Sequence, residues 1–198
     1  ATNSTVSLGG NFTTAGLGLL QRSGGTVNLS GVLDNTAANL TLNAATGSWN
    51  LLGGTIRGGS LSFADGARLA FQNNTNNYLD GVAISGPLDL STANGAVRLS
   101  ASTTFGGPIQ FTANGTRVGL DVGQVRDNAS IFFNSSGSNL YTLSAEGNGA
   151  LTFGANHVIE GGGGRILNGS FLSGTSATIV NQGRITANVS GKAIEIAP

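Results

Sequence analysis

The residues best suited to chemistry in this chain are carboxylates with a basic neighbour, and they gather at one place in the sequence. Asp121, Arg126 and Asp127 lie within one short, polar stretch. Polysaccharide lyases and hydrolases use clustered carboxylates, often beside Arg or Lys, for metal binding, proton abstraction or glycosidic cleavage. We therefore take these three residues as possible ligand contacts. A surface ion pair among them is the simpler interpretation.

The other acidic residues are dispersed along the chain, but two of them stand in similar sequence. Ser30–Asp34 reads SGVLD and Ser85–Asp89 reads SGPLD. This match predicts that Asp34 and Asp89 occupy equivalent positions of a repeat and stack on one face. With Arg57 or Arg98 beside them they would line a cleft. The simpler interpretation is an Asp that caps a turn in both copies.

Other elements of known active sites are missing from the sequence. His157 is the only histidine, which excludes a site with several histidines, and we expect it at the surface or in a turn. The run Gly161–Gly164 lacks the GK[ST] ending of a phosphate-binding loop, and the glycine-rich calcium-binding nonapeptide does not occur. Trp49 stands at an alternating strand position that predicts burial in the core. We therefore predict no catalytic, cofactor-binding or metal-binding residue and a protein that is not an enzyme.

The composition is unusual for a globular domain. Only 9% of the 198 residues are charged, Gly occurs 33 times, Cys is absent, and the formal net charge is zero. A globular chain carries about 25% charged residues. Gly, Ser and Asn also dominate flexible linkers, but here 39% of residues are hydrophobic and they are spread evenly. The balance of charge gives no field that would attract nucleic acid or an anionic membrane.

The elements that must position these residues are short strands. In Thr26–Phe63, apolar pairs with period-two alternation recur every nine to thirteen residues, separated by Gly, Asn, Ser, Thr and Asp. Period-two alternation is typical of strands, and those polar residues supply turns. No window offers the apolar stripe of a substantial helix. The pattern predicts strands of about three to five residues in a coil that winds in one direction.

Imperfect repeats support this coil. Val6–Phe12 matches Val27–Leu33 at an offset of 21 residues, and weaker matches include Ile56–Leu61 with Ile166–Phe171 and Gly164–Ile166 with Gly183–Ile185. Parallel strands joined by crossovers wind right-handed in about 98% of cases. The fold prediction is all-β: a right-handed parallel β-helix, or β-solenoid, of roughly seven to nine coils. We predict one domain over residues 1–198, a segment of a longer repetitive protein.

Two stretches depart from the regular spacing. The loop Gln72–Tyr78 is strongly polar, and its Asn residues could share amide hydrogen bonds from coil to coil. Residues 108–153 space their strands unevenly, which predicts a longer excursion from the coil there. At the ends, alternation begins by Val6 and continues through Ala193–Ile196, so we expect no cap at either end and contact with neighbouring blocks or copies stacked end to end.

The sequence resembles a known class of proteins in GGTVNLSGVLDN, LTLNAATGSWNLLGGTIRGGSL and IVNQGRITANVSG. These stretches are similar to the repeats of large bacterial surface or secreted proteins, namely filamentous-haemagglutinin-like adhesins and autotransporter passengers. The resemblance implies a right-handed parallel β-helix that is extracellular and structural or adhesive. It carries over no catalytic residue.

The functional expectation is a non-enzymatic extracellular module: a rod, spacer or stalk of a large surface protein. The alternative is a carbohydrate-active or carbohydrate-binding β-helix, in which Trp49, Tyr78 or Tyr141 could stack on a sugar if exposed. An ice-binding solenoid ranks third, because no Thr-x-Thr triplet occurs. Expected partners are neighbouring β-helix blocks, and glycans or cell surfaces; no nucleic acid and no cofactor are expected. No membrane span and no export signal lie in this segment, so a signal would lie outside it.

Overall fold

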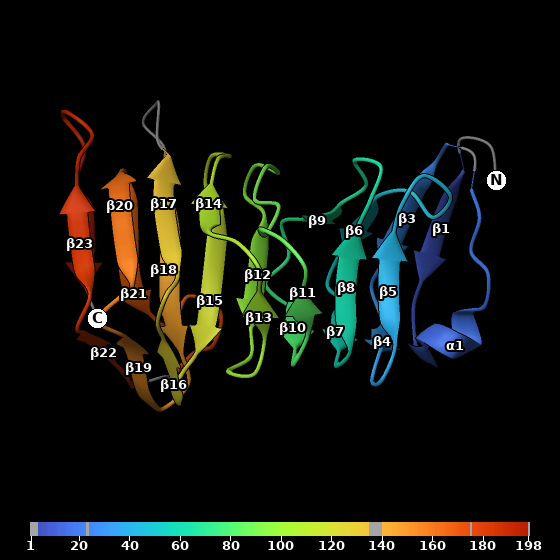
Figure 1. Ribbon diagram of the computed structural model, residues 1–198, viewed down its shortest axis with the longest axis horizontal. Helices are drawn as coiled ribbons and strands as arrows, with labels where there is room; N and C mark the ends of the chain where they lie inside the picture. The colour runs from blue at the N-terminus through green and yellow to red at the C-terminus, as the bar shows by residue number, and fades with distance from the viewer. Residues whose placement is uncertain (1–3, 23, 135–139, 175, 198) are drawn as a thin grey trace.

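A computed structural model describes residues 4–22, 24–134, 140–174 and 176–197. Within these ranges the chain forms 24 strands and a single four-residue helix. Every strand pairing is parallel, and the strands stack as a solenoid of about eight turns. Figure 1 shows the coils side by side from the N-terminal to the C-terminal end, winding right-handed along the axis. The predicted fold class is confirmed.

One sheet runs the whole length of the solenoid and contributes a strand to each turn. We call it the nine-stranded sheet. In order, it contains β2 (Asn11–Thr13), β4 (Val32–Asp34), β7 (Thr55–Arg57), β10 (Tyr78–Asp80), β12 (Ala96–Leu99), β15 (Arg117–Asp121), β18 (Tyr141–Glu146), β21 (Gly164–Asn168) and β24 (Ile194–Ala197).

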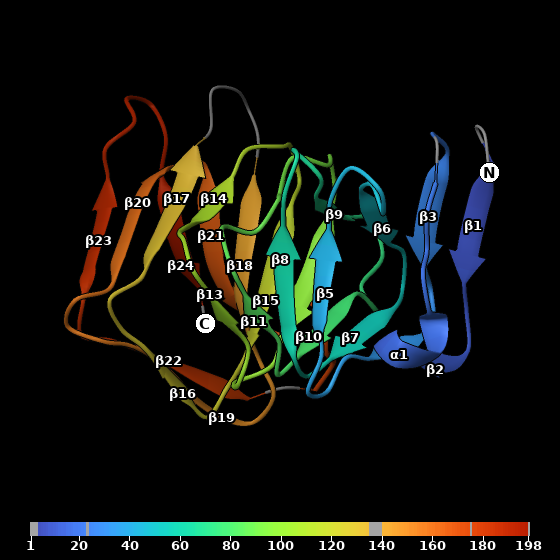
Figure 2. The same ribbon diagram turned by 45° about the vertical axis from the view of Figure 1, so that its right-hand side comes forward.

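The other walls consist of four shorter sheets, two in each half of the molecule, which we name by their first strands. The β1 sheet contains β1 (Thr5–Leu8), β3 (Thr26–Leu29), β6 (Trp49–Leu51) and β9 (Leu69–Phe71), and the β5 sheet contains β5 (Asn39–Leu42), β8 (Ser60–Phe63), β11 (Ala83–Ile84) and β13 (Thr104–Phe105). The β14 sheet contains β14 (Ile109–Phe111), β17 (Ser130–Asn134), β20 (Val158–Gly162) and β23 (Arg184–Ala187), and the β16 sheet contains β16 (Gln124–Arg126), β19 (Gly149–Phe153) and β22 (Ala177–Asn181). Figure 2 shows the β16 sheet turned away from the β14 sheet at the C-terminal half.

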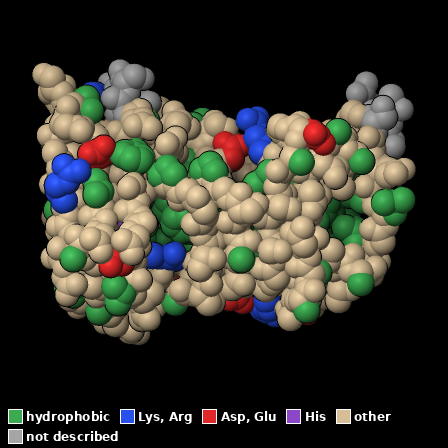
Figure 3. Space-filling model, viewed as in Figure 1, with side chains coloured by type: hydrophobic (Ala, Val, Ile, Leu, Met, Phe, Trp, Pro, Cys, Tyr) green, Lys and Arg blue, Asp and Glu red, His purple; other side chains and the backbone are tan. Residues whose placement is uncertain are grey.

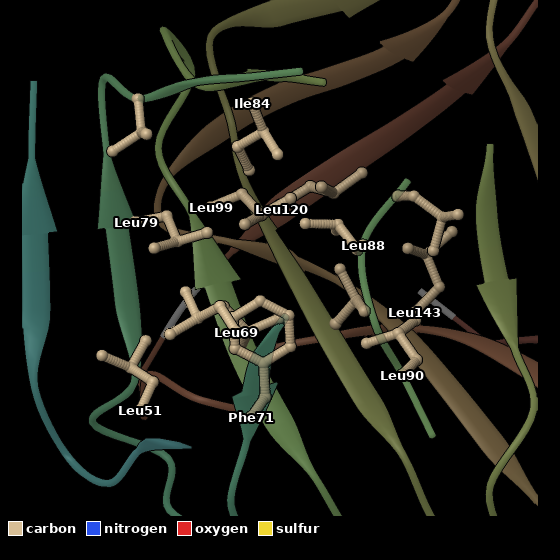
Figure 4. Close-up of a cluster of buried hydrophobic side chains, with 14 of the residues drawn as sticks. Leu51, Leu69, Phe71, Leu79, Ile84, Leu88, Leu90, Leu99, Leu120 and Leu143 are labelled. Atoms are coloured by element: carbon tan, nitrogen blue, oxygen red, sulfur yellow. The ribbon is translucent and has the colours of Figure 1, made fainter. Parts of the chain in front are cut away.

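The core is a set of ladders of inward side chains. Because successive strand residues point to opposite faces, parallel strands in register place the same face of each coil inside. One ladder of the nine-stranded sheet contains Phe12, Leu33, Ile56, Leu79, Leu99 and Leu120, one from each successive coil. Figure 4 shows Leu79, Leu99 and Leu120 converging with side chains of other walls on one apolar interior. The interior is therefore continuous from coil to coil.

The register confirms some of the predicted repeats and rejects others. Val6 pairs with Val27 and Phe12 with Leu33, so the offset of 21 residues is one turn. The stretch Thr26–Phe63 spans two full turns, β3 to β8. By contrast, Gly164–Ile166 lies in the nine-stranded sheet and Gly183–Ile185 in the β14 sheet. That match was wrong because short Gly-rich patterns recur on different walls.

Amide side chains hydrogen-bond from coil to coil, as predicted, and two of them, Gln72 and Asn77, belong to the loop Gln72–Tyr78. On the outer face of the β1 sheet, Asn50 Nδ2 donates to Asn28 Oδ1 at 2.9 Å, and Gln72 Nε2 donates to Asn50 Oδ1 at 3.0 Å. Inside the stack, the buried Asn77 donates to the carbonyls of Gln72 and Ala96 and accepts from Gly53 N–H. Asn77 thereby bonds three backbone groups at a turn, whereas the outer amides bond one another.

The described residues of 108–153 do not show the predicted excursion from the coil; they change walls instead. Described residues of this stretch form β14 to β19 and remain in the solenoid. The β1 sheet ends at β9 and the β5 sheet ends one coil later, at β13. The β14 and β16 sheets begin in the coil after β13. Residues 135–139 lie outside the described residues. The uneven strand spacing in the sequence therefore marks the place where the cross-section changes.

The first coil has a helix on one of its walls, which the sequence analysis did not predict. Helix α1 (Thr14–Leu17) follows β2, where the next coils place strands of the β5 sheet. Thr14 Oγ1 donates to Asn35 Oδ1 at 2.6 Å. Arg22 Nε and Nη2 donate to the carbonyls of Thr46 and Ser48. The segment 14–22 is thus fastened to the second coil, while β1 and β2, the first strands of their sheets, each keep one edge unpaired among the described residues.

Replacing Asn77 by Ala should lower the free energy of unfolding by about 2–4 kcal/mol, because Gly53 N–H and the Ala96 carbonyl lose their side-chain partner and the Gln72 carbonyl loses one of its partners. Chemical denaturation with circular dichroism measures this change. Asn76→Ala is the matched control, because Asn76 is exposed and adjacent. Equal stabilities for the two variants would contradict the role given to Asn77.

Candidate functional site

The three residues selected from the sequence as possible ligand contacts do not form one group. Asp121 ends β15 and forms an ion pair with Arg98, with 3.3 Å between Oδ1 and Nε. Arg126 ends β16, and its Nη1 donates to the carbonyl of Thr103 at 3.0 Å. Asp127 lies in the turn that follows and accepts from Asn156 N–H at 2.7 Å. The interpretation as a mutual ion pair is therefore wrong, because β15 and β16 belong to different walls.

Asp121 lies at the centre of a polar cluster on the outer face of the nine-stranded sheet. Its Oδ2 accepts a hydrogen bond of 2.9 Å from the Tyr78 hydroxyl. The Arg98 guanidinium lies 4.0 Å from the centre of the Tyr78 ring, a cation–π contact. Partial burial raises the pKa of Asp121 and also that of Tyr78. The three side chains hold one another in a fixed arrangement.

Glu146 is a second carboxylate at this cluster that the sequence analysis did not select. It pairs in register with Asp121 on the next strand, β18, and only 1% of it is exposed. Its oxygens accept hydrogen bonds from Ser144 Oγ and from the backbone N–H groups of Ser170, Phe171 and Leu172. A buried charge requires such partners. Glu146 therefore anchors a loop.

That loop, residues 169–174, connects β21 to β22, and we call it the strap. The strap folds back over the outer face of the nine-stranded sheet, where the Phe171 ring packs on Gly119 of β15. A Cβ at Gly119 would lie 2.8 Å from Phe171 Cδ2 and 2.9 Å from Glu146 Cγ. The guanidinium of Arg117 lies 5.8 Å from the centre of the Phe171 ring. Glycine at position 119 provides the space for this contact.

Between the strap and the strands of the earlier coils lies a cleft of about 200 Å³. Phe171 and Leu172 form its wall on the strap side, and Thr55, Tyr78 and Arg98 belong to the opposite wall. Residues far apart in the sequence thus line one small, polar hollow. We call it the strap cleft, and it is the candidate functional site.

One signal in the sequence could have indicated this site. An isolated glycine inside a strand often marks the close approach of another segment, and Gly119 stands within a strand-like stretch, between Val118 and Leu120. The offset of 25 residues between Asp121 and Glu146 gave no comparable signal, because this coil is longer than the first one. The strap itself follows no motif that the sequence reveals.

Arg126 and His157 belong to a different place, the seam between the β5 and β16 sheets. Arg126 and Phe153 pair in register, so Arg126 takes an inward position on an edge strand. Its guanidinium lies 5.2 Å from the centre of the Phe105 ring on the last strand of the β5 sheet. Burial lowers the pKa of Arg126 to about 10. An inward charge on an edge strand discourages further pairing. This accounts for the start of a separate sheet at β16, which does not pair with β13 of the β5 sheet.

His157 closes a turn, one of the two places expected for it, by donating its N–H to the carbonyl of Gly154, but it is buried and not at the surface. It follows the turn at 155–156, is 2% exposed, and stacks on Phe153 with 4.8 Å between ring centres. Burial lowers its pKa to about 4, and the nearby positive charge of Arg126 acts in the same direction. The imidazole is therefore neutral at neutral pH.

Asp34 and Asp89 do not share a face, contrary to the predicted equivalence. Asp34 ends β4 of the nine-stranded sheet, whereas Asp89 follows Leu88, which forms a bridge with Ile109 of the β14 sheet. Each carboxylate accepts from the backbone N–H two residues further on, at 3.0 Å. The simpler interpretation, an Asp that caps a turn in both copies, is confirmed.

The remaining sequence-based expectations concern aromatic residues and metals. Trp49 is 1% exposed in the core, as predicted, and Tyr141 is also buried, which leaves Tyr78 as the tyrosine near the surface. In the part of the chain that the structure describes, no group of three or more His, Asp or Glu side chains could hold a metal ion. Figure 3 shows few charged side chains on one face of the molecule, and several of them stand in adjacent pairs of opposite sign.

Replacing Glu146 by Gln should release the strap while leaving the solenoid folded. The neutral amide places an NH₂ group opposite backbone N–H donors, so the amides of Ser170, Phe171 and Leu172 should exchange with solvent at least roughly tenfold faster. Hydrogen exchange followed by NMR measures this. Glu160→Gln is the control, because Glu160 forms a more open ion pair with Arg184. Unchanged protection in Glu146→Gln would contradict the anchoring role.

The free energy of unfolding should fall as the pH decreases from about 6.5 to about 4. His157 has a lowered pKa in the folded chain, so in this window the unfolded chain binds the extra proton and is favoured. The loss should be at most about 3 kcal/mol, and the raised pKa of Asp121 opposes part of it. Denaturation at several pH values measures the slope. His157→Phe should have a smaller slope than the parent; equal slopes would contradict this assignment.

Comparisons with known proteins were made for the whole chain. No family model, no curated protein and no solved structure matches it. Among the described residues, no helix has the length and apolar character needed to cross a membrane.

Proposed function

We propose that this chain is a non-enzymatic structural or adhesive module, a β-helical rod or stalk segment of an extracellular or cell-surface protein. The observation that carries the proposal is the use of the carboxylates. All nine Asp and Glu side chains have partners within the fold: Asp34, Asp65, Asp80, Asp89, Asp121, Asp127, Glu146, Glu160 and Glu195.

Most of these partners belong to the neighbouring coil. Asp80 pairs with Arg57 at 3.1 Å, and Glu195 pairs with Arg165 at 2.7 Å, in each case across adjacent strands of the nine-stranded sheet. Asp65 Oδ2 accepts from the backbone N–H of Ala44, 21 residues away. Exposed ion pairs contribute little individually, but pairs of this kind favour one register between coils. Carboxylates used in this way support a structural role.

The Asp121–Glu146 pair beside Arg98 is the arrangement that most resembles a catalytic site. Glycosidic cleavage requires two carboxylates. Here Glu146 is surrounded by four donors, and Asp121 is engaged by Tyr78 and Arg98. A carboxylate whose oxygens are already engaged by several donors is not free to contact a substrate. These contacts favour the structural interpretation, and turnover of a glycan by the folded chain would contradict it.

The partner we propose for the module is another β-helical block stacked on its end. The outermost strands β23 and β24 each have one unpaired edge. Ile196 continues the inward ladder of Val97, Val118, Leu143 and Ile166, yet it is 52% exposed. A further coil on this edge would pair the free backbone groups and cover Ile196.

Association of the chain should therefore depend on concentration and on this edge. Sedimentation across a concentration series should show self-association that Ile196→Lys weakens at least about tenfold, because the charge would be buried in the contact. Leu52→Lys is the control, because Leu52 is also an exposed apolar residue, 40% exposed, but lies on the side of the solenoid. A chain that stays monomeric at all concentrations, or equal effects of the two variants, would count against end-to-end stacking.

A further inference from the structure

The strap cleft has the size and the mixed lining of a site for a small polar ligand. Its volume is about 200 Å³, which is below the usual range for drug-sized ligands. Phe171 and Leu172 supply an apolar wall, and Thr55, Asn76 and Arg98 supply polar groups. A ligand bound here would meet apolar carbon on one side and hydrogen-bonding groups on the other.

Several polar side chains of the cleft are not used by the fold. Among the described residues, no hydrogen bond is formed by the hydroxyls of Thr55 and Thr75 or by the side-chain amide of Asn76. The neighbouring Asn77, by contrast, uses its amide on three backbone groups. Outer-face polar groups elsewhere pair with one another, as Thr41 and Ser62 do at 2.9 Å. The strap cleft therefore gathers unused donors and acceptors.

The cleft is held in place by interactions outside it. Phe171 is held against Gly119, and the strap backbone is held by Glu146. On the opposite wall, Arg98 is fixed between Asp121 and the Tyr78 ring. Preorganised groups lose little conformational entropy when a ligand binds. This arrangement suits a binding site better than a surface hollow with loose side chains would.

The charges of the lining indicate a neutral ligand. Arg98 is the charged residue of the lining, and its positive charge is balanced by Asp121 at 3.3 Å. The remaining polar groups are hydroxyls and an amide, each able to donate and accept. A molecule that presents several hydroxyls on one side and C–H groups on the other matches this surface. Such a molecule is a sugar.

We propose that the strap cleft binds one neutral sugar residue of a glycan, with its C–H face against Phe171 and Leu172 and its hydroxyls on Thr55, Thr75 and Asn76. The inference rests on the proposed adhesive function and gives it a partner class. It is independent of end-to-end stacking, so the association measurements and the binding measurements can fail separately.

The test uses the whole chain with defined probes. An array of neutral and acidic oligosaccharides identifies binders, and saturation-transfer NMR with the corresponding free oligosaccharide gives the affinity. Thr55→Val removes one hydroxyl at nearly constant volume, and Asn76→Ala removes the amide at an exposed position. Thr152→Val is the matched control, because Thr152 is an equally part-buried, outward Thr on β19, away from the cleft.

Binding of a neutral oligosaccharide that is weakened about fivefold or more by Thr55→Val and by Asn76→Ala, and left unchanged by Thr152→Val, would support the proposal. In the parent chain, a change in the NMR chemical shift of the Asn76 side-chain amide on saturation with the sugar would also support the proposal. No saccharide binding in the millimolar range, binding of acidic glycans alone, or equal affinities for all three variants would overturn it. Circular dichroism of each variant ensures that the folded chain is compared.

Discussion

The structure depends on one constraint, which is that each coil must pair its backbone with the coil before and the coil after it. Parallel strands separated by about 4.8 Å satisfy their N–H and C=O groups only in register. The register in turn places Leu33, Ile56 and Leu79 directly above one another inside. A slip by one residue would turn this ladder to the solvent. Backbone pairing and apolar burial therefore enforce the same arrangement.

The polar residues of the chain follow from this constraint. Turns between coil walls leave backbone groups without a strand partner, and Asn35 and Asn77 are buried there because their amides donate to carbonyls of neighbouring coils. On the outside, Asn28, Asn50 and Gln72 form a ladder of amides instead of charges. A stack in which equal positions recur at close spacing would place like charges next to each other. Amides avoid this repulsion, which explains the low content of charged residues.

The middle of the molecule shows how the constraint is relaxed. The nine-stranded sheet continues through all coils, while the β5 sheet gives way to the β16 sheet. At this seam Arg126 occupies an inward position that Phe153 takes in the next coil, and it donates to the carbonyl of Thr103. A side chain thus replaces a strand pairing. The same freedom allows the strap to leave the wall after β21 and return over Gly119, where the candidate site is formed.

The sequence by itself determined the fold class, because period-two alternation and polar turns are local properties that appear in every coil. It also determined the one-turn offset between Val6 and Val27 and the turn-capping role of Asp34. It did not determine which wall a given segment joins, since short Gly-rich patterns such as Gly164–Ile166 and Gly183–Ile185 look alike on different walls. The strap cleft was decided only by the tertiary structure. Its members, from Thr55 to Leu172, come from coils far apart along the chain. Gly119 is a local hint of a close approach, but which segment fills its space depends on coil lengths that no local pattern encodes.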